Sequence, residues 1–433
     1  MEVLLNALKK IIPKRLLESL RPIYHYKLAM LAAIAYRFPS RKIFVVGVTG
    51  TKGKSSTVEI LNAILEAAGK KTAVAGTIRF KIGKESRPNL YKMTVPGRFF
   101  VQRFLRQAVN AKCDYAILEM TSEATKQFRH RFISFDALLY LNLAPEHIES
   151  HGSYEKYLNA KLSLTRALET SPKRRKILVV NGDDKEHRKF LAAAPSAEHH
   201  SFSMKEAEPY TLNDQGVRFT WNGESFGSKL QGVFNIMNIL AAATFAKTQG
   251  INGKTIQSAL ERLSEIPGRV QKISAGQNFE VIVDYAHTPD SLEKLYQAFP
   301  SQNKICILGN TGGGRDTWKR PAMAKIAESY CNHIILTNED PYDEDPRAIV
   351  DAMAKVIKAK PLEIIMDRRE AIRRAVELAR TLRQAQGNDD LAVIITGKGT
   401  DPYIMGPNNT KVSWSDAEVA REELHNIGFG EEK

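Results

Sequence analysis

Two series of short, nearly continuous apolar runs alternate with helical stretches along this sequence, and they restrict its fold more than any other feature. The first series has runs at 42–48, 114–120, 135–143 and 176–182, with helical patterns at 55–68, 97–110 and 154–169. The second series has runs at 279–286, 304–310, 333–339, 362–367 and 391–397. Such runs are typical of parallel strands covered by helices on both faces. The sequence therefore predicts an α/β fold with mostly parallel sheets.

The segment GVTGTKGKSST at 47–57 follows the first of these runs. A glycine-rich turn that opens a helix points backbone N–H groups at a bound anion, and the helix dipole favours negative charge there. Lys54 would reach the β- and γ-phosphates, and Ser55 would present its hydroxyl to Mg²⁺. The usual pattern has four residues between its first Gly and the Gly-Lys-Ser/Thr, whereas five separate Gly47 from Gly53. An ordinary βα turn is the alternative, and the run of glycines before Lys54 fits it less well.

The 433-residue chain is long enough for two or three domains. The stretch SEIPGRVQKI is a predicted linker, because Pro267 and Gly268 break the helix before it. We predict three parts, which are a basic helical segment over 1–41, a central P-loop domain over 42–267 and a C-terminal Rossmann-like domain over 268–433.

The first 42 residues carry nine Lys or Arg against two Glu. Their apolar stretch at 28–36 is well short of the ~20 residues that span a bilayer, and no cleavage pattern of a secretory signal follows it. We expect one or two basic amphipathic helices, which either dock on the next domain or make weak contact with anionic lipid at a membrane surface.

The net charge of +15 fits a nucleic acid, a membrane surface or an anionic small ligand. The sequence has no RNP box, no recognition-helix signature and no long Lys/Arg tract, so small phosphate-rich ligands are at least as compatible and no nucleic-acid partner is expected. Cys113, Cys306 and Cys331 are widely separated and form no CxxC pair. We therefore expect neither a disulfide framework nor a zinc cluster, and a reducing, cytoplasmic location.

Two further residues are candidate magnesium ligands. Glu119 ends the run DYAILE, where a carboxylate should emerge beside the glycine-rich turn, although it could instead cap the next helix. His147 follows the next strand, and its spacing alone is more typical of a structural histidine.

Seven motifs in one order resemble those of the Mur ligases, in particular the group that makes UDP-N-acetylmuramyl-tripeptides. They are GVTGTKGKSST, AILEMTSEATKQFR, NLAPEHIESHGSYEKYLNAK, GVFNIMNILAA, DYAHTPDSL, GNTGGGRDTWKRP and ITGKGTD. The resemblance covers roughly residues 42 to 425, and the family's P-loop shares the five-residue gap.

The resemblance implies a monomeric, cytoplasmic ligase with ATP and Mg²⁺ as cofactors. It would activate a carboxylate as an acyl phosphate and add an amino acid to UDP-N-acetylmuramoyl-L-alanyl-D-glutamate, in peptidoglycan precursor synthesis. Its partners would be small molecules.

The resemblance also implies roles for individual residues. The expected catalytic residues are Lys54, Lys161, His147 and Arg315. The expected ATP-binding residues are Gly50, Thr51, Lys52, Gly53, Lys54, Ser55, Ser56, Asn238, Arg269, Asp284 and His287. The expected magnesium ligands are Ser55, Glu119, His147 and, once carbamylated, Lys161. The residues expected to hold the acceptor or the amino acid are Thr77, Thr94, Ser122, Arg129, Lys319, Asp340, Tyr342, Gly397, Lys398 and Asp401.

The sequence departs from the family pattern in three places. Only about 42 residues precede the P-loop, fewer than the family's uridine-binding domain needs, so UDP binding is expected to be reduced, reorganised or absent. The selector Asp-Asn-Pro-Arg reads Glu-Asp-Pro-Tyr at 339–342, which removes an arginine clamp for a carboxylate. Gly-Lys-Gly-His-Glu reads Gly-Lys-Gly-Thr-Asp at 397–401. The added amino acid therefore stays open between diaminopimelate, lysine and another amine.

Two alternatives remain. A ligase similar to folylpolyglutamate synthetase, or a Mur-type ligase on another carrier, would share the P-loop, although the former usually has a second Gly where this chain has Ser55. The second alternative is a regulatory P-loop protein without catalytic activity.

Overall fold

The computed structural model describes residues 14–146, 148–213, 215–300, 302–314, 316–386 and 390–430. The chain divides into two compact units. The first comprises Met1–Met204 with Asn238–Ile256, and the second comprises Lys205–Met237 with Gln257–Lys433. Two predicted site residues, His147 and Arg315, lie outside the described residues.

The first unit is built on an eight-stranded sheet with the order β4-β3-β2-β5-β1-β6-β7-β8. Its strands are β1 (Phe44–Thr49), β2 (Thr72–Ala75), β3 (Arg79–Ile82), β4 (Glu85–Pro88), β5 (Tyr115–Met120), β6 (Ala137–Tyr140), β7 (Ile177–Asn181) and β8 (Glu198–Phe202). The β2-β5-β1-β6-β7-β8 series is parallel, and β3 and β4 join it as antiparallel edge strands. Every residue of β5, β6 and β7 is buried, which explains their continuous apolar sequences.

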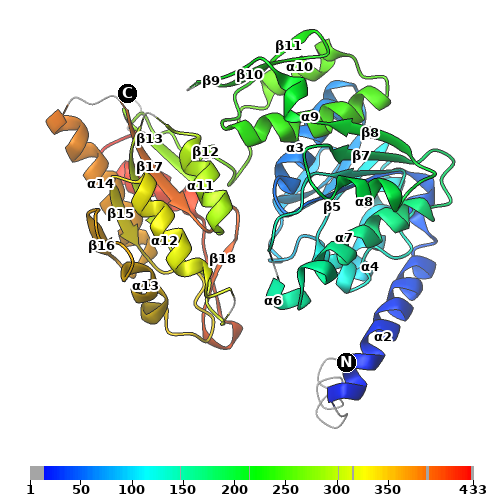
Figure 1. Ribbon diagram of the computed structural model, residues 1–433, viewed down its shortest axis with the longest axis horizontal. Helices are drawn as coiled ribbons and strands as arrows, with labels where there is room; N and C mark the ends of the chain where they lie inside the picture. The colour runs from blue at the N-terminus through cyan, green and yellow to red at the C-terminus, as the bar shows by residue number, and fades with distance from the viewer. Residues whose placement is uncertain are drawn as a thin grey trace. The chain divides into compact units, whose positions relative to one another are not determined.

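Helices of the first unit connect and cover these strands (Figure 1). They are α2 (Lys14–Ala35), α3 (Lys54–Ala67), α4 (Arg98–Asn110), α5 (Ser122–Lys126), α6 (Ile148–His151), α7 (Tyr154–Glu169) and α8 (His187–Ala192), with a 3₁₀ turn at Pro39–Lys42. The helix α3 packs on β1, β2 and β5, whereas α4 and α7 contribute Phe104 and Leu158 to a core that includes Leu118 and Leu138 of the sheet. The helix α9 (Val233–Thr248) crosses from the second unit into the first, and α10 (Gly253–Arg262) crosses back.

The second unit contains a six-stranded sheet with the order β12-β13-β17-β14-β15-β16. Its strands are β12 (Gln271–Lys272), β13 (Glu280–Asp284), β14 (Asn303–Leu308), β15 (His333–Leu336), β16 (Leu362–Ile364) and β17 (Leu391–Thr396). All are parallel except β12. One face packs against α11 (Pro289–Gln297), α12 (Lys319–Tyr330) and α13 (Pro346–Ala354), and the other against α14 (Arg368–Gln386) and α15 (Asp416–Asn426).

Smaller elements complete the second unit. They are an antiparallel sheet of β9 (Tyr210–Asn213), β10 (Gly216–Trp221) and β11 (Glu224–Ser228), a hairpin of β18 (Tyr403–Met405) and β19 (Lys411–Ser413), and 3₁₀ turns that include Pro407–Asn409. A further 3₁₀ turn, Met204–Ala207, lies where the two units meet along the chain.

The predicted α/β class with mostly parallel sheets is confirmed, and each predicted strand overlaps an observed one. The expectation of no disulfide is wrong, because Cys306 and Cys331 form one. The two residues are 25 positions apart, but the crossover through α12 brings the chain back to pair β15 with β14, so that both sulfurs become buried beside each other. In the described part of the chain, no helix has the length and apolar character that crossing a membrane requires.

Candidate active site

The P-loop lies between the end of β1 and the start of α3, as predicted. Asn142, which follows β6, accepts hydrogen bonds at Oδ1 from the backbone N–H groups of Thr51 (3.1 Å) and Lys52 (2.8 Å). Gly53 caps α3 with φ at +81°, a conformation that L side chains rarely adopt. A Cβ on Gly53 would lie 2.3 Å from Oδ1 of Asn238, so the loop passes tightly against α9.

Two lysine ammonium groups meet at one carbonyl of this loop. Lys54 Nζ donates to the oxygens of Gly50 (3.0 Å) and Thr51 (2.9 Å), and Lys161 Nζ donates to the same Gly50 oxygen at 2.7 Å. Lys161 is 1% exposed. Burial, followed by the nearby charge of Lys54, holds the pKa of the Lys161 amine well below its ordinary value, against an opposing effect of Glu146. The site thus concentrates positive charge where the triphosphate of a nucleotide would lie.

A buried carboxylate stands beside these cations. Glu119, at the end of β5, accepts hydrogen bonds from Ser55 Oγ (3.1 and 3.2 Å), from the Thr77 N–H (2.7 Å) and from Thr77 Oγ1 (3.0 Å). The adjacent hydroxyl and carboxylate oxygens are the donors that Mg²⁺ prefers. These residues therefore fit the predicted Mg²⁺, which Ser55 and Glu119 would hold. Within the described ranges, no three His, Cys, Asp or Glu side chains gather as a metal site by themselves.

Three of the residues expected to hold the acceptor, Thr77, Thr94 and Arg129, are linked to Glu119 by successive contacts. Thr77 Oγ1 lies 2.9 Å from Thr94 Oγ1. Arg129 donates to the Val95 carbonyl, next to Thr94, and to Gln127 Oε1 at 2.7 Å. Thr77, Thr94 and Arg129 are therefore brought together.

Ser122 starts α5 and lies 3.1 Å from Nε2 of His151. The imidazole of His151 packs on Tyr157 with ring centroids 5.2 Å apart, and the Tyr157 hydroxyl is 2.9 Å from Thr51 Oγ1 of the P-loop. Sequence reasoning missed His151 and Tyr157. Tyr157 precedes Lys161 by four residues in α7. Residues with this spacing lie on the same face of a helix, so the sequence could have indicated that Tyr157 is close to Lys161.

Other P-loop and nucleotide residues take ordinary structural positions. Ser56 is buried in the first turn of α3. Lys52 pairs with Glu146 at 3.1 Å. Asn238, expected to bind ATP, accepts from Thr57 Oγ1 at 3.4 Å in the first turn of α3.

The predicted nucleotide residues of the second unit gather around the end of β13. The Asp284 carboxylate accepts from the N–H groups of Val270 and Ala286, both at 2.7 Å. The Arg269 guanidinium lies over the Tyr285 ring, 4.6 Å from its centroid, and the His287 ring is also 4.6 Å from that of Tyr285. Gln271 accepts from the Gly268 N–H at 3.0 Å, which shapes the turn that carries Arg269.

A charged cluster forms where β17 ends. Lys398, 1% exposed, donates to Asp340 Oδ1 (2.8 Å), Asp401 Oδ2 (2.9 Å) and the Tyr403 carbonyl (2.6 Å). The predicted residues Asp340, Lys398 and Asp401 are thus in direct contact.

Glu339 lies beside this cluster and was not among the predicted site residues. It is 3% exposed, burial raises its pKa, and its Oε2 has no hydrogen-bond partner in the described part of the chain. Gly397 has φ at +104°, and a Cβ there would lie 2.3 Å from that oxygen. Tyr342, two residues after Asp340, donates its N–H to the Met405 carbonyl. Lys319 begins α12 and pairs with Asp316.

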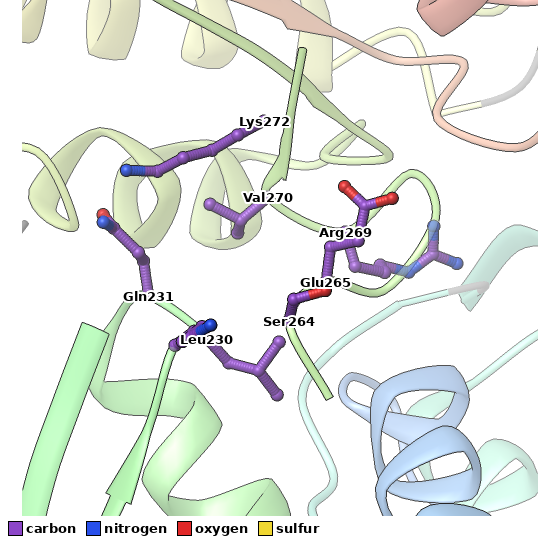
Figure 2. Close-up of a pocket in the computed structure, with 8 residues that line it drawn as sticks. Leu230, Gln231, Ser264, Glu265, Arg269, Val270 and Lys272 are labelled. Carbon is purple, nitrogen blue, oxygen red and sulfur yellow. The ribbon is translucent and has the colours of Figure 1, made fainter. Parts of the chain in front are cut away.

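A separate pocket of about 210 Å³ opens in the second unit at the predicted linker. Figure 2 shows its lining, in which Lys272 and Gln231 face each other and the Arg269 guanidinium points away from them. Its lining includes Arg269, one of the residues expected to bind ATP.

A glycine-rich loop that opens a helix on a parallel sheet, with Lys54 and a buried Ser55–Glu119 pair, defines a P-loop nucleotide-binding protein. Family models narrow this class. The model described as "Mur ligase middle domain" matches residues 48–246, and the one described as "Mur ligase, glutamate ligase domain" matches residues 268–399.

Individual relatives agree. A UDP-N-acetylmuramoyl-L-alanyl-D-glutamate--2,6-diaminopimelate ligase of Syntrophomonas wolfei is 38% identical, over 92% of this chain and 81% of the relative. A UDP-N-acetylmuramyl-tripeptide synthetase of Roseiflexus is 37% identical, over 93% and 82%. Among solved structures, a diaminopimelate ligase of the same description is similar with a TM-score of 0.60 and 26% identity, over 89% of this chain and 79% of that one. Folylpolyglutamate synthase of Mycobacterium tuberculosis shares the fold, with a TM-score of 0.70 at 16% identity, over 87% and 93%.

This chain belongs to the Mur ligase family. It is an ATP-dependent amide-bond-forming ligase whose substrates are small molecules.

Proposed function

We propose that this protein adds a diamino acid to the D-glutamate carboxylate of a muramoyl-L-alanyl-D-glutamate acceptor during peptidoglycan precursor synthesis. The observation that carries this proposal is the convergence of Lys54 and Lys161 on Gly50, beside the Ser55–Glu119 pair, in a chain related to tripeptide synthetases.

The site's charges match the reaction. A carboxylate becomes an acyl donor only after phosphorylation, and the amine then displaces phosphate. ATP and the carboxylate repel each other, and Lys54 and the loop N–H groups offset this repulsion. Ser55 and Glu119 would hold Mg²⁺, which would supply positive charge against the negative charge that develops on the phosphates. Thr94 and Arg129 would position the acceptor, and Lys54 would stay on the transferred phosphoryl group.

The amino acid is proposed to bind at the Asp340–Lys398–Asp401 cluster. Tyr342 stands where related diaminopimelate ligases have arginine, so a second carboxylate on the substrate lacks that clamp. Acidic side chains nearby suit an amine at the far end of the substrate. Lysine meets both conditions, whereas diaminopimelate meets only the second, because its second carboxylate has no arginine here; these two diamino acids are the candidates.

The test is phosphate release from ATP. We expect release only when acceptor and amino acid are both present, and a panel of amino acids scored by product mass identifies the substrate. Release that nucleic acid alone stimulates would support a regulatory P-loop NTPase and contradict the ligase reaction.

We also propose a cytoplasmic monomer that contacts anionic lipid weakly through α2. Ile23, Leu31 and Ile34 are each more than half exposed on this helix, beside Lys27. Sedimentation with phosphatidylglycerol vesicles, but not with phosphatidylcholine vesicles, is expected. A Leu31→Ser, Ile34→Ser variant should stay in the supernatant, and equal sedimentation of both proteins would contradict the contact.

A further inference from the structure

The helix α2 lies against the turn that carries Arg129. The Tyr26 ring is 5.1 Å from the ring of Phe132 and 6.4 Å from that of Phe128, between centroids. The same helix packs against α4, whose first residue is Arg98. Three separate segments of the first unit therefore meet at this junction.

Each segment brings basic side chains to the junction. Arg21 and His25 come from α2, Arg98 from α4 and Arg129 from the turn. Burial lowers the pKa of His25 to about 4, and the charges of Arg98, Arg21 and Arg129 contribute to this shift. Arg98 and Arg129 also have lowered pKa values, mainly through burial. We refer to these four residues as the basic cluster.

Several donors of the basic cluster are buried without a partner. They are Nε and Nη2 of Arg98, Nε of Arg129 and Nδ1 of His25, none of which has a hydrogen-bond partner among the described residues. Arg129 is only 7% exposed. A buried guanidinium donor without an acceptor is unfavourable, so native proteins normally satisfy it. The nearby carboxylate of Glu123 acts on Arg129 but is bonded to Ser150.

The basic cluster adjoins the proposed acceptor site. Arg129 contacts Met93 Sδ (3.5 Å) and the Val95 carbonyl, on either side of Thr94, and Thr94 connects through Thr77 to Glu119. An acceptor with its carboxylate at the P-loop and its body along Thr94 would extend toward Arg98. Guanidinium groups match phosphate oxygens in pairs.

We propose that the basic cluster, centred on Arg98, binds the diphosphate of the acceptor's carrier, whether that carrier is a nucleotide or a lipid. This inference rests on the proposed function. It assigns recognition of the carrier's diphosphate to side chains of α2, of α4 and of the turn that carries Arg129.

Acceptor kinetics test this assignment, with Arg98→Gln as the variant and Arg103→Gln, an exposed arginine on the same helix, as the control. We expect Arg98→Gln to raise KM for a diphosphate-linked acceptor about tenfold, the effect of one lost charge-assisted hydrogen bond. Its KM for carrier-free muramoyl-L-alanyl-D-glutamate, its kcat and its KM for ATP should match those of the control. An equal rise in KM for both acceptors, or no rise for either, would overturn the proposal.

Two diphosphate-linked acceptors distinguish the sources, one linked to UDP and one to a prenyl diphosphate in detergent micelles. The carrier with the lower KM in the wild-type protein is the source, and Arg98→Gln should raise that KM.

A binding measurement separates failure of this inference from failure of the proposed function. With the P-loop saturated by ADP, inorganic pyrophosphate should raise the melting temperature of the wild-type protein and of Arg103→Gln, but not of Arg98→Gln. Without added anion, Arg98→Gln should melt no lower than wild type, since it loses two buried donors, Nε and Nη2, that have no partner among the described residues. A pyrophosphate shift that survives in Arg98→Gln contradicts the site even if ligase activity is found, whereas an Arg98-dependent shift supports it even if the muramoyl acceptor is wrong.

Discussion

Lys161 shows how burial changes what a side chain can do. In water its amine would be protonated, but in α7 it is 1% exposed and shares the Gly50 carbonyl with Lys54. Both effects hold its pKa well below the ordinary value, so losing the proton costs less than it does for an exposed lysine. A neutral amine reacts with CO₂ to form a carbamate, which would turn a cation into an anionic ligand for Mg²⁺.

We expect Lys161→Ala to lower kcat at least about 100-fold, because misplaced phosphoryl-transfer groups typically cost this much. A short carboxylate such as acetate should restore part of the activity. Lys156→Ala, an exposed lysine on the same helix, is the matched control. Full activity of Lys161→Ala in steady-state assays would exclude the carbamate.

His130 illustrates a second effect of burial. It is 2% exposed, neither ring nitrogen has a partner among the described residues, and burial lowers its pKa to about 3, with a further effect of Arg131. Between about pH 3 and the ordinary value of 6.5, the unfolded chain therefore binds the extra proton. Stability must rise with pH in this window and is fully present above it.

The free energy of unfolding should therefore fall on acidification below pH 6.5, by at most ~1.4 kcal/mol per pH unit from this residue. His130→Phe should remove that part of the slope in urea titrations between pH 7.5 and 5. His199→Gln, at an exposed histidine of the same unit, should keep it. Equal slopes in wild type and His130→Phe would show that His130 is protonated in the folded state.

At the scale of the element, α3 depends on glycines at both ends for different reasons. Gly53, at its start, and Gly69, just beyond its end, both have positive φ, at +81° and +74°. A Cβ on Gly53 would collide with Asn238, whereas a Cβ on Gly69 has nothing within 4 Å. The start of the helix is therefore fixed by tertiary packing, and its end by backbone conformation alone.

Gly53→Ala and Gly69→Ala should each lose ~1–2 kcal/mol of stability, the strain of a left-handed alanine. Only Gly53→Ala should also weaken nucleotide binding, raising KM for ATP roughly tenfold, because displaced loop N–H groups lose charge-assisted hydrogen bonds. Parallel denaturation and ATP-saturation curves test this pair. The same KM in both variants would show that Asn238 yields to the added methyl group.

At the scale of the whole molecule, the chain forms two units with cores of their own. The second unit carries the Cys306–Cys331 disulfide, while Cys113 of the first is a buried free thiol. The disulfide closes the loop between Cys306 and Cys331, so it should stabilise only the second unit, which contains this loop.

Reduction should lower the stability of the second unit by ~3 kcal/mol, the loop-closure value for this separation, and leave the first unchanged. Hydrogen exchange by mass spectrometry should show faster exchange in β14, α12 and β15 after reductant. Titration of the unfolded, unreduced chain should find one free thiol, and finding three would contradict the bond.

The sequence predicted much of this protein because its signals are local. Apolar runs predicted nearly all the central strands, and the turn at 47–57 predicted the P-loop. It did not predict β2, β3, β4 or β8 of the first sheet. The strand β4 lacks an apolar run because it is fully exposed at the sheet edge. His151 and Glu339 were not among the predicted site residues. His151 lies beside Ser122, which is 29 positions away in sequence. Glu339 lies against Gly397, a contact that depends on the backbone conformation of this glycine.

The sequence by itself determined the fold class, the family and the position of the P-loop, because hydrophobic periodicity and motif order are properties of the chain. Only the tertiary structure decided that Lys54 and Lys161 share one carbonyl and that Lys398 lies between Asp340 and Asp401. It also decided that donors of the basic cluster are buried with no partner in the described part of the chain. Burial and distance set these charges, and both arise when segments far apart in sequence pack together.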